Sequence, residues 1–300
     1  MSIVVVGSVA LDSLETPFGK AENILGGSAT YFSVSASHFT KDIKLVAIVG
    51  DDFPQDHVDF LQGRGIDLTG LERVNGKTFH WSGRYGSNLN VAETLSTELN
   101  VFEEFAPNLP DSYRNAKYVF LANINPELQM DVLKQAENPE LIVCDTMNLW
   151  ISTQKKELLD VIKHVDIFVL NDAEARQLTE EPNLNKAAKK ILDYGPKRVI
   201  IKKGEHGAVT FTRTSYFAAP AYPLEEVFDP TGAGDSFAGG LLGYLASTGD
   251  LSEQNINKAI IYGTVVASFS VENFGLERQR SLTREEIENR FTEMRAITQF

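Results

Sequence analysis

Cysteine is almost absent from the sequence, which has only Cys144 among its 300 residues. A single cysteine excludes an intramolecular disulfide framework and suits a reducing compartment. Cys144 follows the apolar residues 141–143, which predict a buried strand, so we expect an inert core thiol and not a nucleophile. The five histidines show no metal-binding spacing. We therefore expect no cage of protein ligands around a metal ion.

Positive charge is also scarce, because 28 lysines and arginines face 41 aspartates and glutamates, for a formal net charge of −13. Proteins that bind nucleic-acid backbones need a basic face to displace counterions. This composition therefore argues against a nucleic-acid partner. Any anionic ligand must be met by a local positive site.

Long hydrophobic runs are missing as well. The longest apolar stretch, residues 259–271, is interrupted by Gly263, Thr264 and Ser268 and is too short to span a bilayer. The first residues predict a strand and not a signal peptide. We expect a cytoplasmic protein without a membrane partner, and a hydrophobic content of 43% is enough for a large core.

Short apolar runs recur along the chain, and segments of helical character separate most of them. This alternation predicts an α/β fold in which helices cover both faces of a mainly parallel sheet. Such sheets bind ligands beyond the carboxyl ends of their strands. The runs are 3–6, 45–49, 118–121, 141–144, 167–170 and 199–202, and they are followed by residues 7–12, Asn123, 145–148, Asn171, Lys203 and Gly204.

Residues 72–102 break this alternation. They contain Phe79, Trp81 and Tyr85, a turn at 86–88 and a second extended stretch, which together predict an inserted hairpin. Such a hairpin could cover the site as a lid and offer aromatic faces to a ligand. The alternative is an ordinary antiparallel edge of the main sheet.

The segment 229–235, Asp-Pro-Thr-Gly-Ala-Gly-Asp, precedes apolar residues at helical spacing and so opens a helix. The backbone N–H groups of Gly232, Ala233 and Gly234 can converge on an anion, helped by the positive end of the helix dipole. Asp235 falls in the first helical turn. We expect the dipole to keep its carboxylate ionised and able to accept a proton from an attacking hydroxyl. The alternative is a structural turn followed by a helix-capping acid.

Two other strand ends have simple structural explanations beside functional ones. Asn171 and Glu174 match a capping box, but Glu174 could also hold Mg²⁺ through water. Lys203 and Gly204 lie where a nucleotide could bind, although a lysine on a turn is more often just solvated.

Near the N-terminus, Asp12 could accept hydrogen bonds from two adjacent hydroxyls of a sugar or polyol. Gly26 and Gly27 would permit close approach of the backbone to such a ligand.

Taken in order, these segments resemble the PfkB carbohydrate kinase family, also called ribokinase-like, over the chain from the first strand to about residue 290. The family's C-terminal signature is similar to residues 229–240. Asp235 falls at the position of its catalytic base, and Gly232 to Gly234 fall at its anion hole. The N-terminal glycine pair falls on Gly26 and Gly27.

The family's substrate aspartate falls on Asp12, and its Asn-x-x-Glu motif falls on Asn171 and Glu174. The resemblance implies that ATP, with Mg²⁺, lies across the C-terminal half of the chain. Lys203 and Gly204 would lie near its phosphates or ribose, and Thr264 near its adenine. It also implies a K⁺ site beside Asp229 and Thr231.

The resemblance thus implies a single ribokinase-like three-layer domain over residues 1–300, with a small β-rich lid formed by about 13–24 and 72–102. It predicts an ATP-dependent phosphotransferase acting on a hydroxyl of a sugar or sugar-like molecule. Asn123, which follows a predicted strand, is a further candidate substrate contact. The lid could also pair two copies, so a monomer and a homodimer both remain open.

One departure bears on the acceptor. Tyr31 stands where many sugar kinases of the family carry Asn, which removes an amide that would bind a sugar hydroxyl. With the lid aromatics, a nucleoside or inositol kinase becomes an alternative.

A Rossmann oxidoreductase fits poorly, because Val9 and Asp12 stand where the dinucleotide motif requires glycines. A non-catalytic ligand sensor fits poorly too, because Asp235 and the glycine loop are present.

Overall fold

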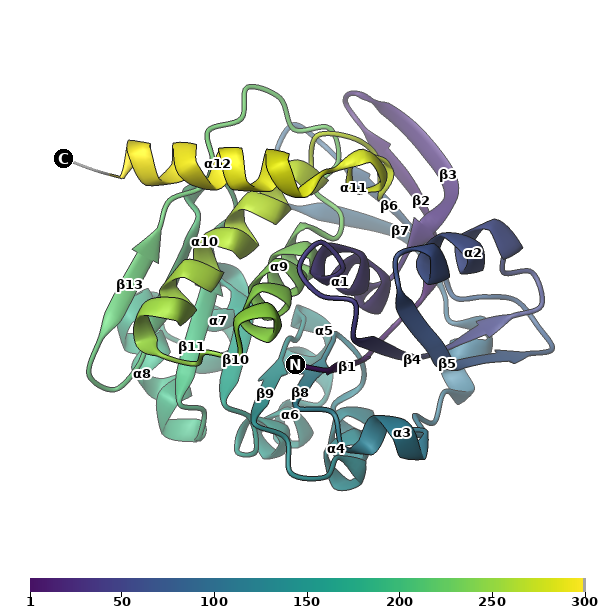
Figure 1. Cartoon of the computed structure of the whole chain (residues 1–300), viewed down its shortest axis with the longest axis horizontal. Helices are drawn as coiled ribbons and strands as arrows, with labels where there is room; N and C mark the ends of the chain where they lie inside the picture. Colours follow the sequence, from purple (N-terminus) through teal and green to yellow (C-terminus); the bar gives the residue numbers. More distant parts are fainter. Residues whose placement is uncertain (299–300) are drawn as a thin grey trace.

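The computed structural model describes residues 1–298, and the remaining residues of the predicted domain, 299 and 300, lie outside the described part. Its centre is a nine-stranded sheet in the order β13-β12-β11-β10-β9-β8-β1-β4-β5, parallel except at the β11-β12-β13 edge (Figure 1). The strands are β1 Ile3–Val6, β4 Ile43–Gly50, β5 Ile66–Val74, β8 Tyr118–Leu121, β9 Leu141–Cys144, β10 Ile167–Asn171, β11 Arg198–Lys202, β12 Ala208–Phe211 and β13 Tyr216–Ala219.

All six apolar runs predicted as strands are strands of this sheet, so the predicted α/β fold is confirmed. Residues alternate between the two faces of each strand. Val143, Val169 and Ile200 therefore belong to one core, whereas Val199 and Ile201 belong to the other. This alternation decides which side chains at the strand ends face the candidate site.

Helices cover both faces and complete three layers. The first core is covered by α1 Ser28–Ala36, α2 Gln55–Gly63, α9 Ala233–Thr248 and α10 Glu253–Ser270. The second is covered by α3 Asp111–Arg114, α4 Pro126–Gln135, α5 Asn148–Thr153, α6 Lys155–Ile162, α7 Asp172–Thr179 and α8 Leu184–Tyr194. The chain ends with α11 Glu277–Ser281 and with α12 Arg284–Ile297, which packs on α10 in Figure 1.

A separate four-stranded sheet, in the order β3-β2-β6-β7, stands beside the main one, and we call it the lid sheet. The predicted hairpin is present as β6 and β7, which pair with each other and not with the main sheet. The predicted range 72–102 is too wide, because 72–74 end β5 and residues 100–104 form the 3₁₀ helix η1 Asn100–Glu104. The lid strands are β2 Ala10–Thr16, β3 Gly19–Gly26, β6 His80–Tyr85 and β7 Ala92–Glu98.

Within residues 1–298, no helix combines the length and the hydrophobicity needed to cross a membrane. Cys144 is fully buried at the end of β9, where burial raises the pKa of its thiol well above the usual value. The buried position predicted for this cysteine is therefore confirmed.

Candidate functional site

The anion loop, residues 229–234, enters α9 through a left-handed residue. Gly232 is the N-cap of the helix, with φ of +71°. A Cβ added to Gly232 would lie 2.3 Å from the ring of Tyr31, which leaves no room for a side chain. Positive φ and the close approach both require glycine at this position. Glycine at this position therefore keeps the start of α9 clear of a side chain, although the N–H of Ala233 already donates to the carbonyl oxygen of Pro230 at 3.2 Å.

Asp229 organises the loop from below. Its Oδ1 accepts a hydrogen bond from the backbone N–H of Thr231 at 2.9 Å, and its Oδ2 accepts one from Gly275 at 2.8 Å. The side chain is fully buried, and burial raises its pKa above the ordinary value despite these hydrogen bonds. Asp229 therefore links the anion loop to the segment that follows α10.

Asp235 lies in the first turn of α9, as predicted. The expectation that the helix dipole keeps its carboxylate ionised is wrong for this environment. Burial and the nearby carboxylates of Asp145 and Asp12 raise the pKa of Asp235 to about 8, although Lys202 acts in the opposite direction. Desolvation disfavours the charged form by more than the single positive neighbour favours it. Asp235 is thus placed as a carboxylate that can take up a proton at neutral pH.

An ion pair that the sequence did not predict lies beside the anion loop. Lys202 Nζ donates to Asp145 Oδ2 at 2.8 Å, and the two side chains are only 18% and 4% exposed. A Cβ added to Gly234 would lie 2.8 Å from the same Nζ. The lysine that reaches the anion loop is therefore Lys202, one residue before the predicted Lys203.

The direction of these side chains follows from strand alternation. Lys202 and Asp145 each lie two residues beyond a member of the core that α9 covers, namely Ile200 and Val143. Residues two apart in a strand share a face. Both side chains therefore face α9, and period-two counting along the predicted strands would have found them.

Asn171 and Glu174 form the predicted capping box at the start of α7. Asn171 Oδ1 accepts from the backbone N–H of Glu174 at 2.8 Å, and Glu174 Oε2 accepts from that of Asn171 at 2.7 Å. Burial raises the pKa of Glu174 to about 7; the charge of Lys202 lowers this pKa and the charge of Asp145 raises it. Glu174 therefore lies close enough to the Lys202–Asp145 ion pair to be affected by both charges. The capping role and a place at the site are therefore compatible.

Asp12 lies on β2 of the lid sheet, buried against the glycine pair. A Cβ added to Gly26 would lie 1.9 Å from Asp12 Oδ2, so only glycine fits there. Gly27 is the N-cap of α1, with φ of +96°. Burial and the charge of Asp229 raise the pKa of Asp12 to about 7, although a hydrogen bond from the Gly27 backbone lowers it.

Two other predicted substrate contacts, Tyr31 and Asn123, differ in whether their side chains already form hydrogen bonds. Tyr31 is 1% exposed, and its hydroxyl has no hydrogen-bond partner among residues 1–298. Burial and then the negative charges of Asp229 and Asp12 raise its pKa well above 10.0. In contrast, the Asn123 side chain is already engaged, accepting from Trp150 Nε1 at 2.8 Å. Tyr31 thus has a buried donor to offer a ligand.

The lid sheet reaches the anion loop directly. The Thr231 hydroxyl donates to the phenol oxygen of Tyr85 on β6 at 3.1 Å. At the hairpin loop, a Cβ on Gly204 would lie 2.2 Å from Asn90 Oδ1, so the loop contacts the turn after β11. The lid sheet therefore touches two segments of the C-terminal half.

The remaining predicted nucleotide contacts, Lys203 and Thr264, form hydrogen bonds within their own segments and none to the anion loop among residues 1–298. Lys203 lies in the turn after β11, where its backbone N–H donates to Gly207. Thr264 is buried in α10, and its hydroxyl donates to Ile260 of the same helix at 3.0 Å. Over residues 1–298, no three His, Cys, Asp or Glu side chains gather as a metal cage would require. A magnesium ion at Glu174 would thus depend on water and on phosphate oxygens.

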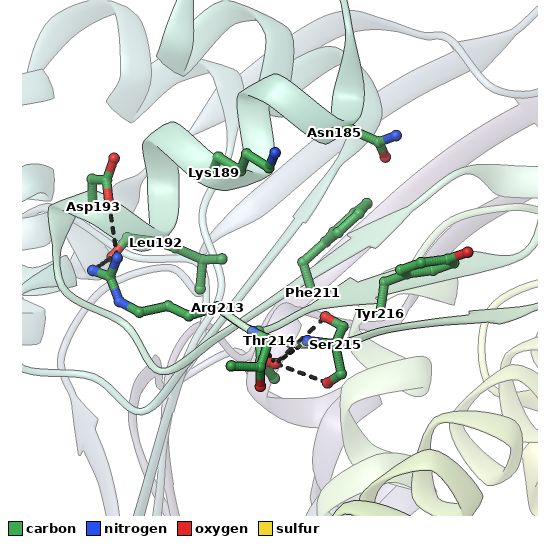
Figure 2. A pocket seen from close by; sticks show the side chains of 10 residues that line it. Asn185, Lys189, Leu192, Asp193, Phe211, Arg213, Thr214, Ser215 and Tyr216 are labelled. Carbon is green, nitrogen blue, oxygen red and sulfur yellow. Dashed lines mark hydrogen bonds and ion pairs between the residues drawn. The ribbon is translucent and has the colours of Figure 1, made fainter.

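A separate hollow of about 650 Å³ lies away from these residues, between α8 and the β12–β13 turn (Figure 2). Phe211 pairs with Val199, near the start of β11, so this hollow is at the opposite end of that strand from Lys202. None of the residues predicted for the site lines it. Its lining residues are Asn185, Lys189, Leu192, Asp193, Phe211, Thr212, Arg213, Thr214, Ser215 and Tyr216.

Comparison with known proteins gives concordant matches. The profile of the pfkB family carbohydrate kinases matches residues 2–281. A cytidine kinase of Thermococcus kodakarensis is 30% identical over 247 residues, covering 81% of this chain and 87% of its own length.

Solved structures share the fold. A nucleoside kinase of Burkholderia thailandensis, in complex with inosine, has a TM-score of 0.79 at 20% identity and covers 97% of both chains. A ribokinase II of E. coli, in complex with ATP and Mg²⁺, has a TM-score of 0.80 at 18% identity and covers 97% of this chain and 99% of its own. The predicted ribokinase-like fold is confirmed.

Proposed function

The chain belongs to the pfkB family of carbohydrate kinases and is a kinase with a hydroxyl acceptor, and we propose that this acceptor is the ribose of a nucleoside. The observation that carries the proposal is the register of β2 and β6, which pairs Asp12 with Trp81. Neighbours in register lie on the same face of a sheet. A carboxylate suited to a diol therefore lies next to an aromatic ring suited to a base.

This face of the lid sheet is the one turned toward the anion loop. Trp81, Gly83 and Tyr85 alternate onto one face of β6, and Tyr85 bonds Thr231. The Trp81 ring lies along the strand over Gly83, where a Cβ would come within 2.2 Å of the ring. In the proposed complex, Asp12 accepts from the ribose 2′- and 3′-hydroxyls and the base lies against Trp81.

The transfer then follows from the remaining geometry. The acceptor oxygen attacks the γ-phosphorus of ATP, its proton passes to Asp235, and the bond to the β,γ-bridging oxygen breaks to release ADP. In the proposed complex, the N–H groups of Gly232 and Gly234 donate to the oxygens on which charge is held, and that of Ala233 joins them by leaving the carbonyl oxygen of Pro230. Magnesium, when bound with ATP, supplies further neutralisation of the phosphate charge. Glu174 would orient its water ligands, and Lys203, Gly204 and Thr264 would contact the nucleotide.

A monovalent cation forms a further part of the proposal. The fully buried Asp229 has no lysine or arginine partner among its contacts in residues 1–298. K⁺ beside Asp229 and Thr231 would compensate its charge and hold the anion loop. Replacing K⁺ by Na⁺ or Li⁺ at constant ionic strength should lower kcat. Equal rates in all three salts would refute the proposed K⁺ site.

The decisive experiment is ADP formation with MgATP over matched acceptors: cytidine, inosine, ribose, deoxyribose and myo-inositol. We expect turnover of a nucleoside, with Trp81→Ala raising the nucleoside KM about 10-fold or more through lost stacking. Leu149→Ala, at an exposed residue on α5, serves as the control. Preference for free ribose or inositol, with no effect of Trp81→Ala, would assign a sugar or cyclitol acceptor instead.

The edge strand β7 supports a proposed homodimer through the lid sheet. All seven of its residues are exposed, including Leu95 at 46%. Unpaired edge strands readily pair with a second chain. Light scattering of the unmodified protein should give twice the mass of one chain, and the variant Leu95→Lys should give the mass of a single chain. A monomer for the unmodified protein would refute the pairing.

A further inference from the structure

Lys202 stands out because it is a nearly buried lysine at the mouth of an acidic site. Its ammonium lies against Gly234 of the anion loop and bonds Asp145 at 2.8 Å. Its charge is among the largest influences on the pKa values of Glu174 and Asp235, and it lowers both.

The ion pair is also unusual in its reach. Lys202 ends β11 and Asp145 follows β9, and β10 lies between these two strands. The lysine side chain therefore extends across the carboxyl end of β10 to meet its partner. Asp145 is itself held in place, since its Oδ1 accepts from the backbone N–H of Thr146 at 2.8 Å. The pair thus fixes the ammonium beside the first turn of α9.

Charge balance gives this placement a chemical meaning. Without a cation, the site would present four acidic side chains, Asp12, Asp145, Glu174 and Asp235, to an incoming phosphate. In phosphoryl transfer, negative charge is spread over the three equatorial oxygens of the group in transit. A fixed positive charge at the N–H groups of the loop stabilises that arrangement most when water is excluded.

Resting on the proposed kinase function, we propose that Lys202 is a catalytic residue whose ammonium binds the transferring phosphoryl group, and that Asp145 is a positioning residue that holds Lys202 at the anion loop. This role differs from that of Lys203, which lies in the following turn. It also differs from a purely structural role, in which the ion pair only ties β9 to β11.

Steady-state kinetics of four full-length variants separates these roles. Lys202→Met keeps the length of the side chain and removes its charge, whereas Lys202→Arg keeps the charge. The double variant Lys202→Met with Asp145→Asn removes both charges and so leaves no unpaired buried group, which guards against misfolding. Lys197→Met, which breaks a Lys–Asp pair at the other end of β11, is the matched control.

We expect Lys202→Met to lower kcat about 100-fold or more, which is the loss typical when one donor to a developing oxyanion is removed. The KM for ATP should change less than about threefold. The double variant should stay equally slow, Lys202→Arg should recover part of the rate, and Lys197→Met should match the unmodified enzyme. Recovery of the rate in the double variant would show a purely structural ion pair and overturn the proposal.

A measurement without an acceptor keeps this test independent of the proposed substrate. Isothermal titration of MgADP, with and without aluminium fluoride as a mimic of the phosphoryl group in transit, needs no turnover. Lys202→Met should lose the extra affinity gained with aluminium fluoride and keep that for MgADP alone. Equal gains in the variant and the unmodified enzyme would refute the proposal even if no acceptor has been found.

Discussion

The Thr231 hydroxyl donates a 3.1 Å hydrogen bond to Tyr85, so the lid sheet and the anion loop are in direct contact. Thr231 lies immediately before Gly232, and Tyr85 ends β6 at the hairpin loop. The lid sheet therefore forms part of the surroundings of the anion loop. Elements that cover a phosphoryl-transfer site commonly exclude water from it.

Tyr85→Phe removes this contact without removing the ring. We expect kcat/KM for the acceptor to fall about fivefold, in line with one neutral hydrogen bond of about 1 kcal/mol. Tyr216→Phe, at a tyrosine that is 77% exposed on β13, is the control and should leave kcat/KM unchanged. Equal values for Tyr85→Phe and the unmodified enzyme would show that this hydrogen bond does not contribute to the reaction.

Asp235→Asn tests the proton acceptor. The amide cannot take the proton of the attacking hydroxyl, so kcat should fall by about 10³-fold, within the range for a general base. Binding of MgATP, measured by isothermal titration, should remain within about threefold of the original. A kcat close to that of the unmodified enzyme would remove Asp235 from the mechanism.

Gly232→Ala tests the anion loop. The new Cβ would meet the Tyr31 ring and adopt positive φ, so we expect kcat to fall about 100-fold as the N–H groups are displaced. Gly249→Ala is a matched control, because Gly249 has φ of +65° at the other end of α9. It should cost a similar backbone strain of about 1 kcal/mol in thermal unfolding and leave kcat intact. Equal kcat in both variants would refute the role of the loop.

The raised carboxylate pKa values predict how the rate depends on pH. Asp235 must be ionised to accept a proton, so kcat/KM for the acceptor should rise as pH increases toward about 8. Asp145→Asn removes a negative neighbour that raises the pKa of Asp235, so the rise should move to lower pH. A pH profile that is flat from about 6 to about 8 would contradict this.

The same groups predict the pH dependence of stability. Asp12 has a pKa of about 7 in the folded protein, and that of Asp235 is about 8, both above the usual aspartate value of 3.8. Between pH 3.8 and about 8, the folded state therefore binds more protons than the unfolded state, so the free energy of unfolding should fall as pH rises. Thermal unfolding of the ligand-free protein should occur at lower temperature at pH 8 than at pH 5.5, by about a few degrees. Asp235→Asn should reduce the difference.

Much of the fold could be predicted from local patterns. The short apolar runs predicted strands because parallel strands are buried on both faces, and the Gly-Ala-Gly segment before apolar residues predicted the start of α9. The limits of the lid sheet could not be predicted as well. They depend on whether residues 72–74 pair with β4 or with the hairpin, and that choice is made by tertiary contacts.

The site was predicted in outline but not in its electrostatics. A helix dipole acts locally, so the sequence suggested an acidic Asp235, whereas burial and carboxylates from distant segments decide its pKa. Lys202 was not predicted because Lys202 and Lys203 both follow the apolar residues 199–201, and their place in the sequence does not distinguish them. Only the face of β11 to which each belongs separates the two lysines.

The lone, buried Cys144 makes the chain well suited to optical labelling. Because its thiol is enclosed at the end of β9, a cysteine introduced at the exposed Ser87 of the lid hairpin would be the single reactive thiol among residues 1–298. A fluorophore attached there would report, in real time, whether the nucleotide or the acceptor moves the hairpin first.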